Sequence, residues 1–102
     1  MRIKAKKKDI DEVILAAYQT ISPTHKEEGC LEYRVFHANR ELIIFGTWKS
    51  QMALDMHLLL QSHCNLVEDL LPPLCKKIKI KIYKELEPPI TPLISRYTCT
   101  HE

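Results

Sequence analysis

The chain has 102 residues, of which 45% are hydrophobic, and a formal net charge of +2 at pH 7. This is the size of one small domain, which buries a modest core and benefits from a second subunit, and so mild a charge does not favour nucleic acid as a partner. No apolar run approaches the roughly 20 residues that span a bilayer, and the lysine-rich amino end lacks the apolar segment of a signal peptide, so we expect a cytoplasmic protein and no membrane.

The first two predicted elements are a short strand and a helix. Residues 1–7 alternate between apolar and basic side chains, which is the period of a half-buried strand. From Ile10 to Ile21 the apolar residues recur at steps of three and four, which predicts an amphipathic helix that ends near Pro23. A polar segment, residues 24–28, then leads to Gly29.

Residues 31–48 predict a β-hairpin. Leu31, Tyr33 and Val35 alternate with their neighbours, and a polar turn at residues 38–40 returns the chain. The returning strand is apolar almost throughout, as is typical of strands that are covered on both faces. We therefore expect another subunit against one face of the sheet.

A second helix is predicted from Ser50, a suitable N-cap, to Leu71, where two prolines end it. At about 100° per residue, one side of this helix carries a largely apolar set: Ala53, Met56, His57, Leu60, Cys64, Val67 and Leu71. Leu59, Leu66 and Leu70 fall outside this set, which indicates either a bend near residues 62–63 or a second apolar surface that meets another subunit.

The last predicted strand runs from Lys77 to Leu86 and closes a domain of residues 1–86. Residues 87–102 are rich in proline at their start and still contain apolar side chains, so we expect a tail that packs on a neighbouring subunit. The order strand, helix, strand, strand, helix, strand predicts the α+β class, with a ferredoxin-like antiparallel sheet covered by helices on one face.

Cysteines, histidines and lysines offer three further interpretations. The four cysteines are far apart, so we expect reduced thiols, most of them buried, and a nucleophilic cysteine stays an open alternative. His57 and His63 are six residues apart, about 120° on a helix, so we expect no metal site. The alternating lysines lack interleaved aromatic residues and are typical of a solvated face. Because the first and last strands of such a fold are neighbours, we expect one basic surface, formed by Lys4, Lys6, Lys79 and Lys81.

One stretch resembles a known family. Its residues are Glu28-Gly29-Cys30-Leu31 with Tyr33, then Trp48, Ser50, Ala53-Leu54 and His57, and finally Ser62-His63. They are similar to the antibiotic-biosynthesis monooxygenase family of dimeric α+β-barrel proteins, and the order of elements matches over residues 1–86. The resemblance implies a homodimer, a substrate cavity between helices and sheet, and activities that include oxygenation of quinols or anthrone-type polyketides without a cofactor.

His57 is the candidate catalytic residue, because an imidazole on the apolar side of a helix can accept a proton near neutral pH. The alternative is a core histidine bonded to a backbone carbonyl. The candidate substrate-binding residues, each of which packing alone would also explain, are Trp48, Tyr33, Tyr18, His63 and Asn65.

Together these observations favour a monooxygenase that uses no metal or other cofactor and acts on a small electron-rich aromatic of the quinol or anthrone type. The alternative is a non-catalytic dimeric protein of the same fold that binds a small molecule or takes part in a stress response.

Overall fold

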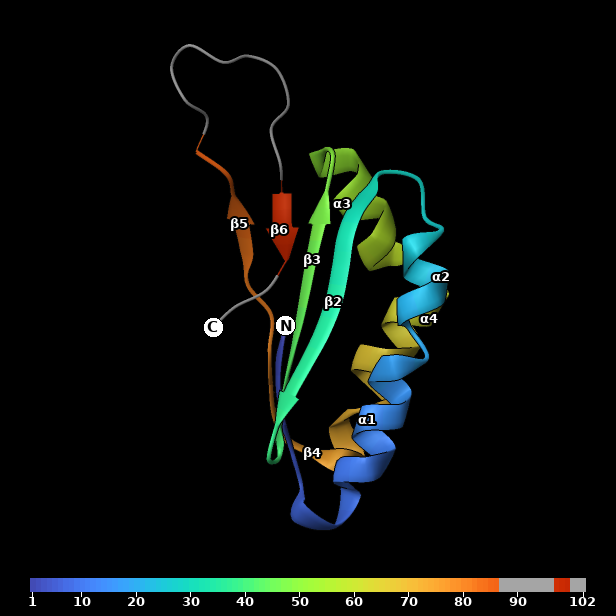
Figure 1. The fold of residues 1–102 in the computed structure, drawn as a ribbon. Coiled ribbons are helices and arrows are strands. Elements are labelled where there is room, and N and C mark those ends of the chain that lie inside the picture. Colours follow the sequence, from blue (N-terminus) through green and yellow to red (C-terminus); the bar gives the residue numbers. More distant parts are fainter. Residues whose placement is uncertain (87–96, 100–102) are drawn as a thin grey trace.

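The computed structural model describes residues 1–86 and 97–99, and Figure 1 shows their arrangement as a sheet with helices on one face. The strands are β1 (Arg2–Ala5), β2 (Cys30–Ala38), β3 (Glu41–Trp48), β4 (Cys75–Lys79), β5 (Ile82–Lys84) and β6 (Tyr97–Cys99). The α-helices are α1 (Ile10–Tyr18), α2 (Ile21–His25), α3 (Gln51–Leu59) and α4 (Gln61–Cys64). Short turns of other helix types are η1 (Lys7–Asp9), the π-helix η2 (Asn65–Leu70) and η3 (Pro72–Leu74).

The strands of the described residues pair antiparallel in the order β4-β1-β3-β6-β5, and β2 pairs with β3. β1 lies between β3 and β4, with Ile3 opposite both Leu42 and Ile78. The predicted α+β class and ferredoxin-like arrangement are therefore confirmed. The barrel formed by two subunits stays a prediction.

The β-hairpin is confirmed, with β2 and β3 joined through Asn39 at φ 55°, a conformation that asparagine tolerates. Val35 lies opposite Ile44, and Tyr33 lies opposite Gly46. Leu31 does not share their buried face, because the register shifts between Cys30 and Glu32 and leaves Leu31 exposed.

The second helix is not continuous. Ser50 caps α3 as predicted, since its Oγ accepts a hydrogen bond of 3.1 Å from the Ala53 N–H. Leu60 then adopts an extended conformation with ψ 139°, and the chain continues into α4 and the π-helix η2. The break precedes the predicted bend near residues 62–63 and changes part of the predicted inward set. Leu66 is buried and Leu60 is exposed, contrary to the helical wheel, whereas Leu71 is buried as predicted. Met56, which the wheel also placed inward, is exposed although it lies before the break.

The carboxyl-terminal part of the sheet also differs from the prediction. The single strand expected over residues 77–86 is divided into β4 and β5. Within the predicted tail, β6 pairs with β3 and β5 of the same chain, so this segment is part of the sheet. Residues 87–96 and 100–102 lie outside the described residues, and packing of the tail on a neighbouring subunit stays a prediction.

The core lies between the helices and one face of the sheet. Its fully buried side chains are Trp48, Ile3, Leu42, Leu54, Leu71 and Val13. Of the predicted apolar face of α1, Val13 and Ala17 are buried, whereas Tyr18 is exposed. Within residues 1–86 and 97–99, none of the helices has the length and apolar character needed to cross a membrane.

Candidate active site

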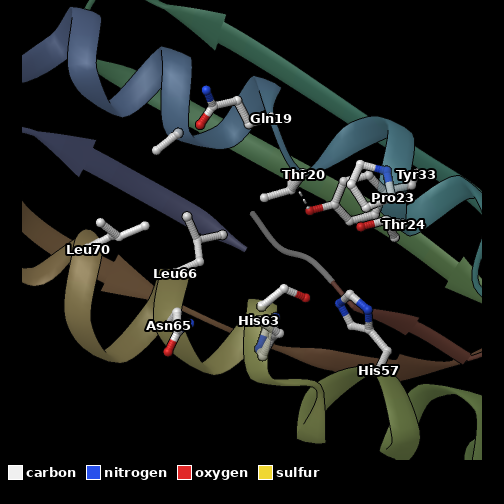
Figure 2. Close-up of a pocket in the computed structure, with 12 residues that line it drawn as sticks. Gln19, Thr20, Pro23, Thr24, Tyr33, His57, His63, Asn65, Leu66 and Leu70 are labelled. Atoms are coloured by element: carbon white, nitrogen blue, oxygen red, sulfur yellow. Dashed lines mark hydrogen bonds between the residues drawn. The ribbon is translucent and has the colours of Figure 1, made fainter.

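A cavity of about 250 Å³ opens between α1 and α2 on one side and α4 and η2 on the other. Figure 2 shows Gln19, Thr20 and Pro23 along one wall, with His57 and His63 facing them. The complete lining is Ala16, Gln19, Thr20, Pro23, Thr24, Tyr33, His57, Ser62, His63, Asn65, Leu66 and Leu70. Four of the five predicted substrate-binding residues meet at or near this space.

His57 lies in the last turn of α3 and is only 6% exposed, so the predicted inward orientation is confirmed. Its ring centroid is 4.4 Å from that of Trp48 and 6.2 Å from that of Tyr33. The alternative of a core histidine bonded to a backbone carbonyl does not describe this side chain, because its Nδ1 atom contacts a carboxylate. His57 is therefore both buried and in contact with a cavity.

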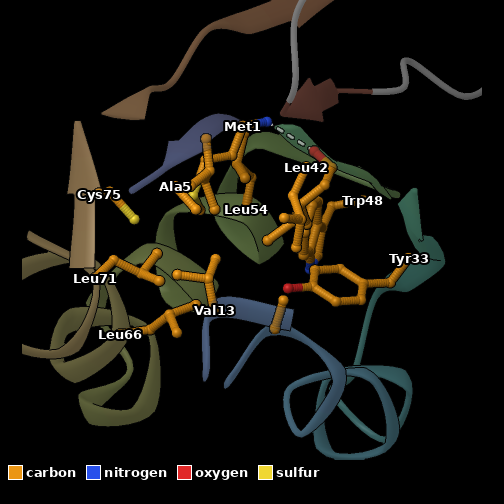
Figure 3. Packing of buried hydrophobic residues seen from close by; sticks show 13 residues of the cluster. Met1, Ala5, Val13, Tyr33, Leu42, Trp48, Leu54, Leu66, Leu71 and Cys75 are labelled. Carbon is orange, nitrogen blue, oxygen red and sulfur yellow. Dashed lines mark hydrogen bonds between the residues drawn. The ribbon is translucent and has the colours of Figure 1, made fainter. Parts of the chain in front are cut away.

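Trp48 and Tyr33 form an aromatic wall behind His57, at one end of the core in Figure 3. Gly46 makes room for the indole, because a Cβ atom at this position would lie 2.4 Å from the Trp48 ring. The Trp48 Nε1–H is buried and finds no hydrogen-bond acceptor in the part of the chain that the structure describes. Trp48 does not line the 250 Å³ cavity but a much smaller one of about 10 Å³, shared with His57 and His63.

Tyr33 lies in the wall of the 250 Å³ cavity and is held in place by the helices. Its hydroxyl lies 3.0 Å from the Thr20 Oγ1 atom, and its carbonyl oxygen lies 2.9 Å from the His25 Nε2 atom. Thr20 in turn donates a hydrogen bond of 2.6 Å to the Ala17 carbonyl. These contacts fix the phenol ring on the cavity wall before any ligand binds.

His63 lies beside His57, contrary to the prediction that the two would diverge. Their ring centroids are 4.9 Å apart, because the extended Leu60 interrupts the helix on which the 120° estimate depended. Burial, together with the nearby His57, lowers the pKa of His63 from 6.5 to about 4. Near pH 7 His63 is thus a neutral hydrogen-bonding group on the cavity wall.

The two remaining candidate substrate-binding residues differ in their position relative to the cavity. Asn65 lines the cavity, whereas Tyr18 is 68% exposed on α1 and does not. Tyr18 was placed inward because it continues the three- and four-residue steps of the helix, yet it is the last residue of α1. As for metals, within the described ranges no three His, Cys, Asp or Glu side chains are grouped to hold an ion.

Glu27 was missed by the sequence analysis. Its carboxylate oxygens lie 2.8 and 3.0 Å from the His57 Nδ1 atom. In the sequence it reads as one of several charged residues in a solvated turn, and only its position two residues before Gly29 sets it apart. A contact between residues 30 positions apart has no signal in local periodicity.

Glu27 also borders a second cavity of about 320 Å³ on the other side of His57. The lining of this second cavity is Glu27, Glu28, Lys49, Ser50, Met52, Ala53, Met56, His57 and Leu60. His57 lines both cavities, whereas Glu27 lines the second and not the first. The imidazole therefore stands in the wall that separates them.

Neither Cys30 nor Cys75 is an activated nucleophile. Burial raises the pKa of the Cys30 and Cys75 thiols above the ordinary value, so both are protonated at neutral pH. Cys30, Cys64 and Cys75 are free thiols, as predicted.

Comparison with known proteins agrees with this fold. The family model described as antibiotic biosynthesis monooxygenase matches residues 1–67. A conserved protein from Methanosarcina mazei Go1 is 25% identical, with a TM-score of 0.69 over 76% of this chain and 78% of that one. A comparison with curated proteins gave no significant match.

Two further solved structures share the fold. Rv0793 from Mycobacterium tuberculosis is 23% identical, with a TM-score of 0.70 over 76% of this chain and 80% of that one. A protein from Bacteroides thetaiotaomicron, described as a possible oxidoreductase, is 22% identical, with a TM-score of 0.67 over 74% of this chain and 82% of that one. Since the family model covers well over half of the sequence, the chain belongs to the antibiotic biosynthesis monooxygenase family.

Proposed function

We propose that this protein is a cofactor-independent monooxygenase that oxidises a small, electron-rich aromatic of the quinol or anthrone type. The observation that carries the proposal is His57, a buried imidazole that lines a cavity of about 250 Å³ beside a second, neutral imidazole. Family membership and the likeness to a protein described as a possible oxidoreductase support an oxidative reaction.

The proposed chemistry begins with proton removal by His57. An anthrone-type substrate has an acidic CH₂ group conjugated to a phenol, and loss of one proton gives a carbanion that transfers an electron to dioxygen. The resulting radical and superoxide combine to a peroxide anion, which takes the proton back from the imidazolium. Loss of the second C–H proton and cleavage of the O–O bond then release water. The balance is R₂CH₂ + O₂ → R₂C=O + H₂O, so the substrate supplies all the electrons.

The surroundings of His57 suit this reaction. Trp48 and Tyr33 exclude water from one side of the ring, and a dry site favours charge transfer from substrate to dioxygen. The Gln19 and Asn65 amides offer hydrogen bonds to substrate oxygens. The volume is below the range of roughly 300 to 1,000 Å³ that is typical of drug-sized ligands, so we expect a substrate of few rings.

Dioxygen uptake tests the proposal. The parent protein is mixed with a panel of hydroquinones and anthrones, and we expect His57→Ala to lower the enzymatic rate by about 10² to 10⁴-fold, the usual contribution of a positioned base. His37→Ala is the matched control, because His37 is an exposed imidazole on β2 outside the cavity. Equal uptake by parent and His57→Ala across the panel would refute the proposal.

We include in this proposal a homodimer built through the sheet face that the helices leave uncovered. On that face Phe36 lies opposite Ile43, and Phe45 lies opposite Arg34. Phe36 is 51% exposed in the single chain, whereas Ile43 and Phe45 are half-buried. An aromatic side chain so exposed on a sheet is suited to burial against another subunit.

Sedimentation velocity tests the dimer. We expect the parent to sediment as a dimer at micromolar concentration and Phe36→Glu to dissociate at least tenfold more readily, because it places a carboxylate in an apolar contact. His37→Glu, a change at the next residue of β2, controls for the added charge. A monomeric parent at all concentrations would contradict the homodimer without bearing on the chemistry at His57.

A further inference from the structure

We propose that Glu27 is the positioning residue of His57: it holds the imidazole with the proton on Nδ1, so that Nε2 is the nitrogen available to the substrate. The structural part of this inference stands on geometry alone. Its catalytic part rests on the proposed function, in which His57 acts as the base.

The hydrogen-bond geometry determines the tautomer. Both Glu27 carboxylate oxygens lie within 3.0 Å of Nδ1. An ionised carboxylate accepts hydrogen bonds and does not donate them, so Nδ1 must carry the proton. In the neutral ring Nε2 is then the unprotonated nitrogen, and it points away from Glu27 because the two ring nitrogens face in different directions. Glu27 borders only the second cavity, so the substrate cavity lies on the side that Glu27 leaves free.

The backbone holds Glu27 firmly in this place. Its N–H donates to the Thr24 carbonyl over 3.0 Å, and its own carbonyl accepts from the Cys30 N–H over 3.2 Å. Gly29 has a φ of +88° and sits so close to α3 that a Cβ atom would lie 2.6 Å from the Ala53 Cβ. The turn is therefore pressed against the helix that carries His57. A carboxylate fixed in this way differs from an ordinary solvated surface glutamate, and its side chain is only 17% exposed.

The same contact places a carboxylate directly beside His57. When the ring accepts a proton at Nε2, the imidazolium lies directly against the Glu27 carboxylate, and an adjacent opposite charge stabilises it. Tyr33 and His63 also face the ring, and His63 is uncharged near pH 7. The charged amino group of Met1 and that of Lys49 belong to residues that line the small cavity and the second cavity together with His57. Glu27 need not take up a proton to have this effect, because its role is to orient the ring and to balance its charge.

Nitrogen-15 NMR of the full chain tests the structural part without any substrate. At a pH where the ring is neutral, we expect the parent His57 to show a protonated Nδ1 and an unprotonated Nε2. Glu27→Gln is expected to give a mixture of tautomers, because a carboxamide can either accept from Nδ1–H or donate to an unprotonated Nδ1. Glu28→Gln is the matched control, since Glu28 is the exposed neighbouring residue and, among the described residues, the carboxylate bonded to His57 is that of Glu27 and not that of Glu28. An unchanged Nδ1–H signal in both Glu27→Gln and Glu27→Ala would overturn the inference.

Steady-state oxidation tests the catalytic part. Glu27→Gln is expected to lower kcat by about 10²-fold with little change in KM, since Glu27 does not line the substrate cavity. In Glu27→Ala, formate is expected to restore part of kcat, because the second cavity admits a small anion beside Lys49. A raised KM with unchanged kcat, or no rescue by formate in a folded Glu27→Ala protein, would refute this part. A parent without activity would refute the proposed function, and the NMR result would still decide the role of Glu27.

Discussion

The two faces of β3 differ in burial, although both belong to the same strand of eight residues. On one face Leu42, Ile44 and Trp48 are buried under the helices of the same chain. On the other face Ile43 and Phe45 are only half-buried. Ile43 lies opposite Arg2 of β1, and Glu41 lies opposite Lys4. The covered face carries the candidate site, because only there is water excluded from an imidazole and an indole. The uncovered face is the surface on which the proposed second subunit would bury the apolar side chains that the helices of one chain leave exposed.

A group of charged side chains also lies on the uncovered face of the sheet. Arg2, Lys4, Lys77 and Lys79 gather with Glu41 on the uncovered face, where β1 pairs with β4. Of the predicted basic surface, Lys4 and Lys79 lie in this group, whereas Lys6 and Lys81 do not line it. Arg2 pairs with Glu41, and Arg34 pairs with Glu32, at 2.8 and 3.1 Å. These acids moderate the positive charge of a surface that would otherwise resist an apolar partner.

The largest effect is expected when an aromatic side chain is removed from the covered face. Trp48→Ala should reduce the free energy of unfolding by about 3 to 5 kcal/mol, because it leaves a cavity in a fully buried site. Phe45→Ala, on the same strand but the other face, should cost about 1 kcal/mol. Urea denaturation of both variants measures the difference. Equal losses at low protein concentration would mean that the two faces are covered alike.

The next effect comes from the turn that carries Glu27. Gly29→Ala should cost about 1 to 3 kcal/mol, because an L-residue is strained at a φ of +88°. The added methyl group also meets Ala53 and should push Glu27 away from His57. A double-mutant cycle with Ala53→Gly, followed by urea denaturation, separates the two causes. If Ala53→Gly does not relieve any of the loss, the close approach contributes nothing and only the backbone strain remains.

A smaller effect is expected from protonation on the covered face. The pKa of His63 is about 4 in the folded protein, against 6.5 as the ordinary value. Between these pH values the unfolded chain binds more protons than the folded protein, so stability falls as the pH drops from 6.5 to 4. His63→Gln should make the free energy of unfolding less dependent on pH within this window. His37→Gln, on the exposed part of β2, is the control, and an identical pH profile for parent and His63→Gln would contradict the buried, neutral state of His63.

The smallest effect is expected on the uncovered face. The Arg2 and Glu41 side chains are 45% and 40% exposed, so their ion pair is largely screened by water. Glu41→Gln should change the free energy of unfolding by less than about 1 kcal/mol, and the change should vanish at high salt. Urea denaturation at low and high ionic strength checks this. A loss above 2 kcal/mol would indicate that this face is much less solvated than its exposure suggests.

The sequence by itself determined the hairpin, the position of the first helix and the start of the second. Alternation defined the hairpin, the three- and four-residue steps defined the first helix, and Ser50 marked the start of α3. The inward orientation of His57 also followed from helical period, because Ser50 and His57 belong to one uninterrupted helix. Such patterns are local, and they predict the average face of a helix better than each residue on it, since Met56 of the same helix is exposed.

Tertiary structure alone decided how the site is assembled. One extended residue, Leu60, broke the helix and brought His63 beside His57, so the predicted divergence of these two residues was wrong. Glu27 and His57 are paired although they are 30 positions apart. β6 pairs with β3 although it lies beyond the predicted end of the domain at residue 86. Neither contact could be read from periodicity, because periodicity states which face a side chain occupies and never which distant residue it meets there.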